Sequence, residues 1–170
     1  LYGRGACGEN VNWVMTLDGT LTISGKGRIS NYDYSNRAPW YACRQYIKSV
    51  VIKSGVTGIG NCAFYYCDAL TGVTIPNTVT AIGDEAFCNC EALTSVTIPN
   101  SVTTIGDGAF SYCEALTGMT IPGSVKTISG RAFSGCTSLR SVTIPNGVTV
   151  IDESLFYGCT SLTSVTIPSS

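Results

Sequence analysis

The chain has 170 residues, of which 44% are hydrophobic and 12% charged, and its formal net charge at pH 7 is -1. This hydrophobic content provides enough side chains for a core and argues against a disordered tail. The net charge near zero argues against a uniformly basic nucleic-acid-binding protein. The chain contains no histidine, which excludes Ser-His-Asp and Cys-His catalysis and every metal site with a histidine ligand. No hydrophobic run approaches the roughly 20 residues that a membrane-spanning helix requires.

Residues 1–46 are predicted to form a β-rich N-terminal cap. They hold both tryptophans and five of the nine tyrosines. Hydrophobic and polar residues alternate from Val11 to Met15 and again after an Asp18-Gly19 turn, which is the pattern of a β-hairpin. Residues 38–50 are predicted to contain a short helix that leads into the next segment.

Two kinds of residue in this cap are candidates for function. Cys7 and Cys43 are the best candidates for a disulfide if the protein is exported, because exported proteins fold in oxidising surroundings. Two free thiols are the alternative, since a sequence does not place Cβ atoms. Tyr32, Tyr34 and Tyr41 are candidate anchors for a partner if they are exposed, and core residues of the cap if they are buried.

Residues 47–170 repeat a pattern every 23 residues, and a period of this length indicates a solenoid. The coils are 47–69, 70–92, 93–115, 116–138 and 139–161, with a partial sixth at 162–170. Equivalent residues of stacked coils are expected to form continuous columns in the core. Two of these columns are Phe64, Phe87, Phe110, Phe133 and Phe156, and Cys67, Cys90, Cys113, Cys136 and Cys159.

Each coil is predicted to contain two short extended segments. In the coil 93–115, residues 96–98 alternate in hydrophobicity as a strand does, and Pro99 ends that strand because it has no backbone donor. Residues 102–105 form the second segment. Gly106 then turns the chain, and Asp107 is predicted to cap a single helical turn that delivers Phe110 to the core. Parallel strands of successive coils would pair about 4.8 Å apart.

The stretch "LTSVTIPNSVTTIGDGAFSYC" resembles the BspA-like, or Treponema-type, leucine-rich repeat. The resemblance covers residues 47 to 170, and the preceding region resembles the segment often found ahead of such repeats. It implies a leucine-rich-repeat solenoid with short parallel β-strands, a convex side of turns or 3-10 segments, and a β-rich cap. It also implies a bacterial, secreted or cell-surface protein for interaction or adhesion, with host extracellular proteins among its targets. A non-binding spacer within a larger surface protein is the alternative.

The cysteine column is interpreted as buried free thiols, because stacked residues have parallel rather than convergent Cβ vectors. The cysteine spacings do not match the paired C-x2-C of zinc sites, and we assign no metal and no cofactor.

Charged residues suggest one further surface. Asp68, Glu91 and Glu114 share a repeat position and are expected to form an acidic row. The row is interpreted as a solvated face, or as a stripe that meets a basic partner or weakly holds calcium. Asp84 and Asp107 are expected to cap turns. The outward positions of the strands carry small hydroxyls and glycines, without aromatic or arginine anchors.

No catalytic residue is assigned, because carboxylates adjacent in sequence point apart and stacked coils offer no evident cleft. The expected partner is an extracellular or cell-surface protein or glycoprotein, and neither nucleic acid nor a membrane span is expected. No polar cap follows the sixth strand. We therefore expect that the natural protein continues, that Pro168 blunts this edge, or that two chains associate through it.

Overall fold

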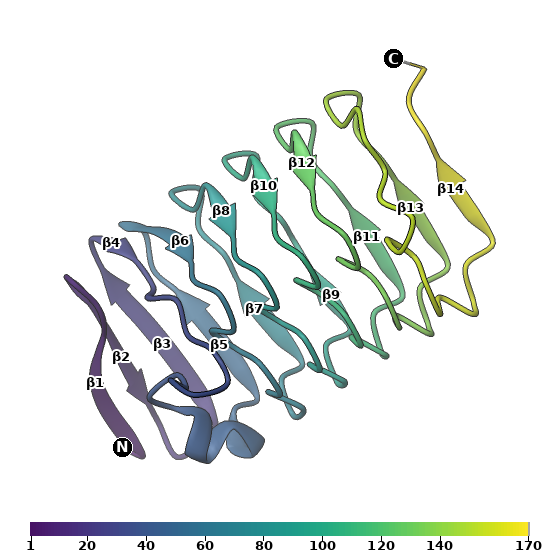
Figure 1. Ribbon diagram of the computed structural model, residues 1–170. Helices are drawn as coiled ribbons and strands as arrows, with labels where there is room; N and C mark the ends of the chain where they lie inside the picture. The colour runs from purple at the N-terminus through teal and green to yellow at the C-terminus, as the bar shows by residue number, and fades with distance from the viewer. Residues whose placement is uncertain (170) are drawn as a thin grey trace.

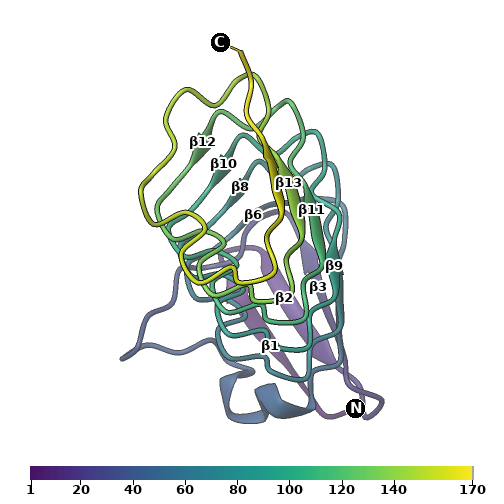
Figure 2. The same ribbon diagram turned by 90° about the vertical axis from the view of Figure 1, so that its right-hand side faces the viewer.

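A computed structural model describes residues 1–169. Its short strands occupy equivalent places in successive coils, and the coils stack from the N-terminus to the C-terminus (Figure 1). Seen along the stack, each coil passes through two sheets and a set of turns around a common interior (Figure 2). The predicted solenoid with parallel strands is confirmed.

The cap contributes three antiparallel strands: β1 (Gly3–Gly8), β2 (Val11–Met15) and β3 (Thr20–Gly25). The predicted hairpin of β2 and β3 is present, with Trp13 opposite Ile23. Asp18 stabilises its turn, because one carboxylate oxygen accepts the Thr20 N–H at 3.0 Å. The sequence analysis did not predict β1.

The cap and the solenoid share one sheet, because β3 pairs in parallel with the first strand of the repeats. This sheet has the order β1-β2-β3-β5-β7-β9. Its repeat strands are β5 (Ser49–Ile52), β7 (Gly72–Thr74) and β9 (Ser95–Val96). The later coils continue this side with β11 (Gly118–Thr120), β13 (Ser141–Thr143) and β14 (Ser164–Thr166). The domain boundary at residue 46 stays a prediction, and hydrogen-bonded strands connect its two sides.

The second extended segments of the first four coils form the other sheet together with β4 of the cap, in the order β12-β10-β8-β6-β4. The fifth coil was predicted to have such a segment as well, but no strand forms between Thr143 and Ser164. Its strands are β4 (Gly27–Arg28), β6 (Val56–Ile59), β8 (Ala81–Ile82), β10 (Thr104–Ile105) and β12 (Thr127–Ile128). The predicted short helix is the 3-10 helix η1 (Tyr41–Tyr46).

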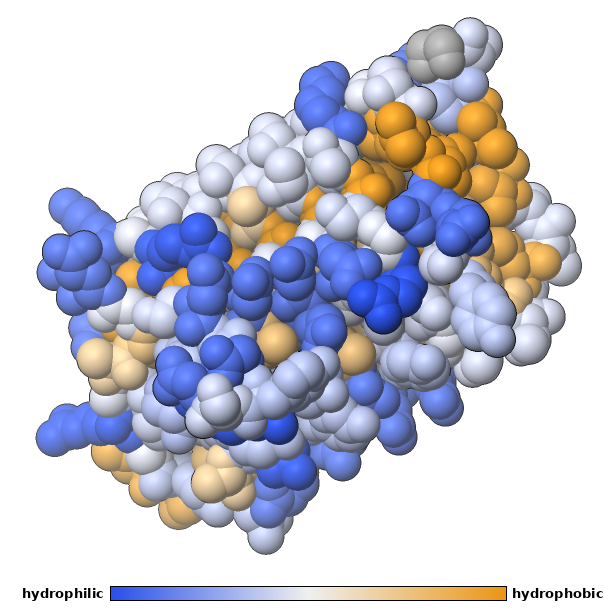
Figure 3. Space-filling view, in the orientation of Figure 1, coloured by the Kyte–Doolittle hydropathy of each residue, from blue (hydrophilic) through white to orange (hydrophobic). Residues whose placement is uncertain are grey.

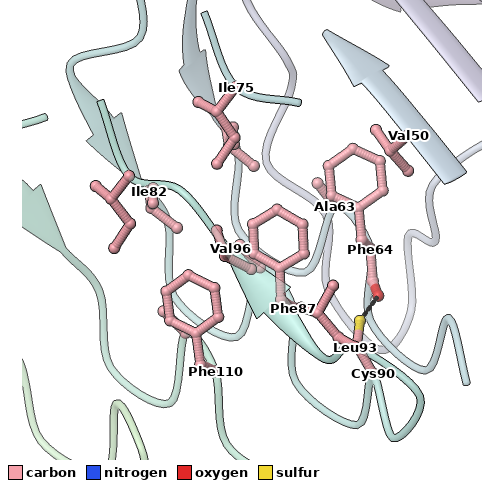
Figure 4. Close-up of a cluster of buried hydrophobic side chains, with 14 of the residues drawn as sticks. Val50, Ala63, Phe64, Ile75, Ile82, Phe87, Cys90, Leu93, Val96 and Phe110 are labelled. Atoms are coloured by element: carbon pink, nitrogen blue, oxygen red, sulfur yellow. Dashed lines mark hydrogen bonds between the residues drawn. The ribbon is translucent and has the colours of Figure 1, made fainter. Parts of the chain in front are cut away.

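The phenylalanine column fills the core, as predicted (Figure 4). Adjacent rings stack with centroids 5.2 to 6.0 Å apart. Trp40 of the cap extends the stack, since its ring lies 5.5 Å from that of Phe64 and its Nε1–H donates to the Ala63 carbonyl at 2.9 Å. The cap therefore covers the first ring of the column, whereas Phe156 at the other end is only partly buried.

The cysteine column consists of free thiols, as interpreted. Each thiol from Cys90 onward donates a hydrogen bond to the carbonyl of a phenylalanine one coil earlier, at 3.0 to 3.3 Å. Figure 4 shows the bond from Cys90 to Phe64. Burial raises the pKa of Cys136 to about 12. The cysteine side chains thus fill part of the core and also donate hydrogen bonds between successive coils.

The cap cysteines are not paired in the structure, in contrast to the disulfide considered above. Cys7 and Cys43 are both free and buried. Cys7 precedes Gly8, which pairs with Val11 at one end of β2. The Cys43 sulfur lies 3.6 Å from that of Met15 at the other end. The five residues of β2 span about 13 Å, which is more than disulfide geometry bridges.

The last coil has an apolar edge. Val150 and Ile167 are 74% and 62% exposed, and hydrophobic side chains gather at the C-terminal end of the face in Figure 3. Association of two chains through this edge stays a prediction.

Candidate interaction surface

The strand face is a shallow polar surface. Its outward residues are small, as expected, and Thr97, Thr120 and Thr143 are exposed along it. A depression of about 750 Å³ crosses this face between the second and fifth coils, and no charged or aromatic side chain lines it. Side chains at Gly72 and Gly118 would meet nothing within 4 Å. The face therefore lacks the aromatic and arginine groups that usually dominate binding energy.

The acidic row lies where the sequence analysis placed it. Asp68, Glu91 and Glu114 are all exposed at the turns between the cysteine and leucine columns. No group of three or more acidic or cysteine side chains among residues 1–169 is arranged to hold a metal ion. The row has the geometry of a solvated face, and it lines neither the depression on the strand face nor the pocket described below.

The turns that carry the phenylalanines differ from the prediction. No helical turn forms there; instead, the residues two before and two after each phenylalanine adopt left-handed conformations in most coils. The reason is the inter-coil hydrogen bonding. Every second N–H of a turn donates to the next coil, as in the bonds from Phe64 to Ala86 and from Tyr66 to Cys88 at 2.8 and 2.9 Å. Alternation of left- and right-handed residues aims these N–H groups in one direction.

Left-handed backbone costs about 1–2 kcal/mol for a residue other than glycine. Three of these positions are glycine: Gly108, Gly135 and Gly158. Six are not, and their φ angles range from 51° to 59°: Cys62, Tyr66, Glu85, Asn89, Tyr112 and Arg131. Strain of this kind persists where surrounding structure enforces it, and it is found at functional sites more often than elsewhere.

Five of these six strained residues line a single pocket of about 290 Å³. We call this the tyrosine pocket. Its main side chains are Tyr34, Tyr65, Tyr66, Tyr112, Glu85, Asp107 and Arg131. The pocket combines residues of the cap with turns of the first four coils.

The tyrosines of the pocket contact one another. The ring of Tyr65 lies 5.4 Å from that of Tyr34 and 4.6 Å from that of Tyr66, both edge-to-face. The hydroxyl of Tyr34 donates to Oε2 of Glu85 at 2.6 Å, and this bond raises the pKa of Tyr34. Burial raises the pKa of Tyr65, so both phenols are neutral at physiological pH. Tyr112 lies against Gly135, where a Cβ would be 2.5 Å from its ring.

The side chain of Arg37 contacts these tyrosine rings from outside the pocket. The Arg37 guanidinium lies 5.2 Å from the ring centroid of Tyr34, 5.4 Å from that of Tyr65 and 4.5 Å from that of Tyr41. Its Nη1 is buried and has no hydrogen-bond partner among the described residues. The rings therefore stabilise a desolvated cation, which is the behaviour of a cation–π site.

The charged side chains of the pocket are partly paired. Arg131 donates to Asp107 at 2.6 Å, and this is the only ion pair within residues 1–169. The neighbouring acid, Asp84, does not cap its own turn as predicted. Its carboxylate accepts the N–H of Asp107, the equivalent residue of the next coil, at 2.8 Å. Asn61 accepts the Asp84 N–H in the same way at 2.9 Å, so these side chains connect successive coils.

The predicted cap tyrosines have three different fates. Tyr34 is 59% exposed and belongs to the pocket. Tyr41 is half-buried beside Arg37 and Arg44. Tyr32 packs partly buried against the core, and its hydroxyl donates to the Cys7 carbonyl at 3.4 Å.

The sequence analysis missed Tyr65, Tyr66, Tyr112 and Arg131. A signal was available for two of them. Tyr66 and Tyr112 occupy a repeat position that is glycine in the fourth and fifth coils, so bulky aromatic residues there break the repeat without serving the core.

The stacked columns, the short parallel strands and the inter-coil ladders define a leucine-rich-repeat solenoid. The BspA type leucine rich repeat region matches residues 37–163 in 6 copies. The chain belongs to this family. No protein among the curated sequences matches the chain.

Solved structures of bacterial proteins resemble this chain over most of its length. A leucine rich repeat protein of T. pallidum is 27% identical, with a TM-score of 0.76 over 91% of this chain and 78% of that protein. A leucine-rich repeat protein of Bacteroides ovatus is 29% identical, with a TM-score of 0.72 over 94% of this chain and 46% of that one. A leucine rich cell surface protein of Faecalibacterium prausnitzii is 30% identical, with a TM-score of 0.70 over 96% of this chain and 39% of that protein. The chain thus spans less than half the length of the last two.

Leucine-rich-repeat proteins are a non-enzymatic scaffold family whose members are typically protein-interaction modules. Within residues 1–169, no helix is long and apolar enough to cross a membrane.

Proposed function

We propose that this chain is a protein-binding module of a secreted or cell-surface protein, and that it binds an extracellular protein or glycoprotein through the tyrosine pocket. The observation that carries the proposal is the placement of Tyr66 and Tyr112. Both residues adopt left-handed backbone, and they are 39% and 46% exposed. Inter-coil hydrogen bonds require the left-handed backbone at this position of each coil, and glycine, found there in the fourth and fifth coils, adopts it without strain. A binding role accounts for exposed tyrosines at this position in place of glycine.

The composition of the pocket supports a role in binding. Tyrosine and arginine are the residues most often responsible for affinity at protein interfaces. The pocket gathers four tyrosines with Arg131, whereas the depression on the strand face contains none of these types. The extracellular setting is supported by the family and by the similarity to a cell surface protein.

A binding screen with two matched variants tests the proposal. The protein is presented to a panel of extracellular matrix proteins and cell-surface glycoproteins, and binding is measured by surface plasmon resonance. The double variant Tyr66→Gly/Tyr112→Gly removes two rings and also removes left-handed strain. The control Gly118→Arg places a long side chain on the strand face, where a Cβ meets nothing within 4 Å.

We expect saturable binding that the double variant abolishes and Gly118→Arg leaves unchanged. Thermal unfolding of all three proteins checks that the variants are folded. The reverse pattern, with loss only in Gly118→Arg, would move the binding site to the strand face. Absence of binding to the whole panel would favour a structural spacer instead.

A further inference from the structure

Resting on the proposed function, we propose that the tyrosine pocket binds a basic side chain, lysine or arginine, of the partner protein. The charge, the ring arrangement and the shape of the pocket each favour such a guest.

The formal charge of the pocket favours a cation. Arg131 and Asp107 form an ion pair at 2.6 Å and cancel each other. Glu85 remains as a half-buried carboxylate that accepts a hydrogen bond from the neutral hydroxyl of Tyr34. Among the side chains that line the pocket, a positively charged guest would therefore balance Glu85, whereas an acidic guest would bring a third negative charge into the pocket.

The tyrosine rings favour the same guest. Cations are attracted to aromatic faces within about 6 Å, and a pocket of several rings stabilises them further. The chain already shows this with its own Arg37, which lies 5.2 Å and 5.4 Å from the rings of Tyr34 and Tyr65. Arg37 does not line the pocket. A second cation can therefore approach from the pocket side, where Tyr66 and Tyr112 add ring surface.

The shape suits a long side chain with a charged end. The pocket of about 290 Å³ opens to solvent between turns of adjacent coils. Gly108 leaves room in the pocket, since the equivalent residues of the neighbouring coils, Glu85 and Arg131, carry long side chains. The aliphatic stem of a lysine or arginine can lie along the rings while its charged group reaches Glu85. Figure 3 shows a band of hydrophilic side chains along the middle coils, which suits a polar rather than an apolar partner.

Nuclear magnetic resonance with short peptides tests this directly. The probes are acetylated, amidated pentapeptides with lysine, arginine or glutamate between two glycines on each side. We expect the lysine and arginine peptides to shift the amide signals of Tyr66, Glu85 and Tyr112 saturably, with dissociation constants of about a millimolar. The glutamate peptide should leave these signals in place. High salt should weaken the binding, because screening reduces the attraction of Glu85.

Glu85→Gln and Glu91→Gln form a matched pair of variants. Each removes one carboxylate of the same size, but Glu91 belongs to the exposed acidic row and does not line the pocket. Glu85→Gln should weaken binding of the lysine peptide about twofold to fivefold, since the loss of one close charge pair at a solvent-exposed site changes affinity by about that factor. Glu91→Gln should bind the peptide as the unaltered protein does.

Three results would overturn the inference: equal shifts with the glutamate peptide, no shifts with any basic peptide, or equal affinities of the two variants. Saturable shifts of the same amides by N-acetylglucosamine, without shifts by the basic peptides, would assign the pocket to carbohydrate instead. Failure here is separable from failure of the proposed function. If a panel protein binds Glu85→Gln normally and fails to bind the double tyrosine variant, the tyrosine pocket would remain the interaction surface, and a basic side chain would not be its ligand.

Discussion

Alkaline pH is expected to destabilise the solenoid steeply, because its core holds a column of neutral thiols. Burial raises the pKa of Cys136 from 9.0 to about 12. It also raises the pKa of Cys90 and Cys113 well above 9.0. In the unfolded chain these thiols ionise near pH 9, whereas in the folded chain they keep their protons. Above pH 9 the unfolded state therefore binds fewer protons, and the free energy of unfolding falls as the pH rises.

The size of the effect follows from these pKa values. The stabilising contribution of each thiol is complete below pH 9 and decreases from there up to the folded pKa. Between pH 8 and pH 10.5, a thiol whose pKa is raised from 9.0 to about 12 loses about 2 kcal/mol of stabilisation. The pKa values of Cys90 and Cys113 are raised in the same direction by burial, so these two thiols add to the loss at Cys136.

Urea unfolding at pH 8 and pH 10.5, with a reducing agent and circular dichroism as the readout, measures this loss. Cys136→Ser is the control, because a hydroxyl can replace the thiol as donor to the Phe110 carbonyl but does not ionise in this range. Every other ionisable group is common to the two proteins. The variant should lose about 2 kcal/mol less than the unaltered chain. Equal losses in the two proteins would refute the reasoning, since the thiol of Cys136 would then titrate alike in the folded and unfolded states.

Two further predictions concern the stacking of the coils. Phe110 is fully buried between two parallel rings, with centroids 5.4 and 5.8 Å away, so Phe110→Ala should cost about 3–5 kcal/mol in urea unfolding. Phe156→Ala should cost less, because Phe156 has one neighbour and is partly exposed; a loss below about 1 kcal/mol for Phe110→Ala would place that ring outside the core. Asp84→Leu should cost about 0.5–1.5 kcal/mol, because the Asp107 N–H loses its acceptor at an exposed position. Asp84→Asn should stay within about 0.5 kcal/mol in the same assay, and equal losses in the two Asp84 variants would contradict the inter-coil role of this side chain.

The repeat period made most of the fold predictable. A 23-residue spacing places each core residue above its own copy, so the phenylalanine and cysteine columns could be assigned without coordinates. The turns could not be assigned in this way. Local preferences favour a helical turn after Asp107, but the hydrogen bonds to the next coil require left-handed residues instead. Contacts between coils therefore override the local preference, and a sequence window does not contain them.

The tyrosine pocket was less predictable, because it depends on a contact between distant segments. Tyr34 lies 51 residues before Glu85 in the sequence. Their hydrogen bond forms only because the cap segment that carries Tyr34 crosses the turns of the repeats. No periodic signal reports such a crossing. The sequence offered the cap tyrosines as candidate anchors, but it could not separate the exposed Tyr34 from the partly buried Tyr32.

Stacking also explains why a binding site would lie at this place. In a regular solenoid, each exposed position repeats from coil to coil, so the surface consists of uniform columns that distinguish no partner. Specific recognition requires a place where the columns vary. The position two residues after each phenylalanine reads Tyr66, Asn89, Tyr112, Gly135 and Gly158 along the stack. Glycine adopts the left-handed conformation without strain, whereas the two tyrosines adopt it at an energetic cost. This variation lies where the cap segment carrying Tyr34 crosses the turns, so the place where the column varies also brings Tyr34, Tyr66 and Tyr112 together with Glu85 and Arg131.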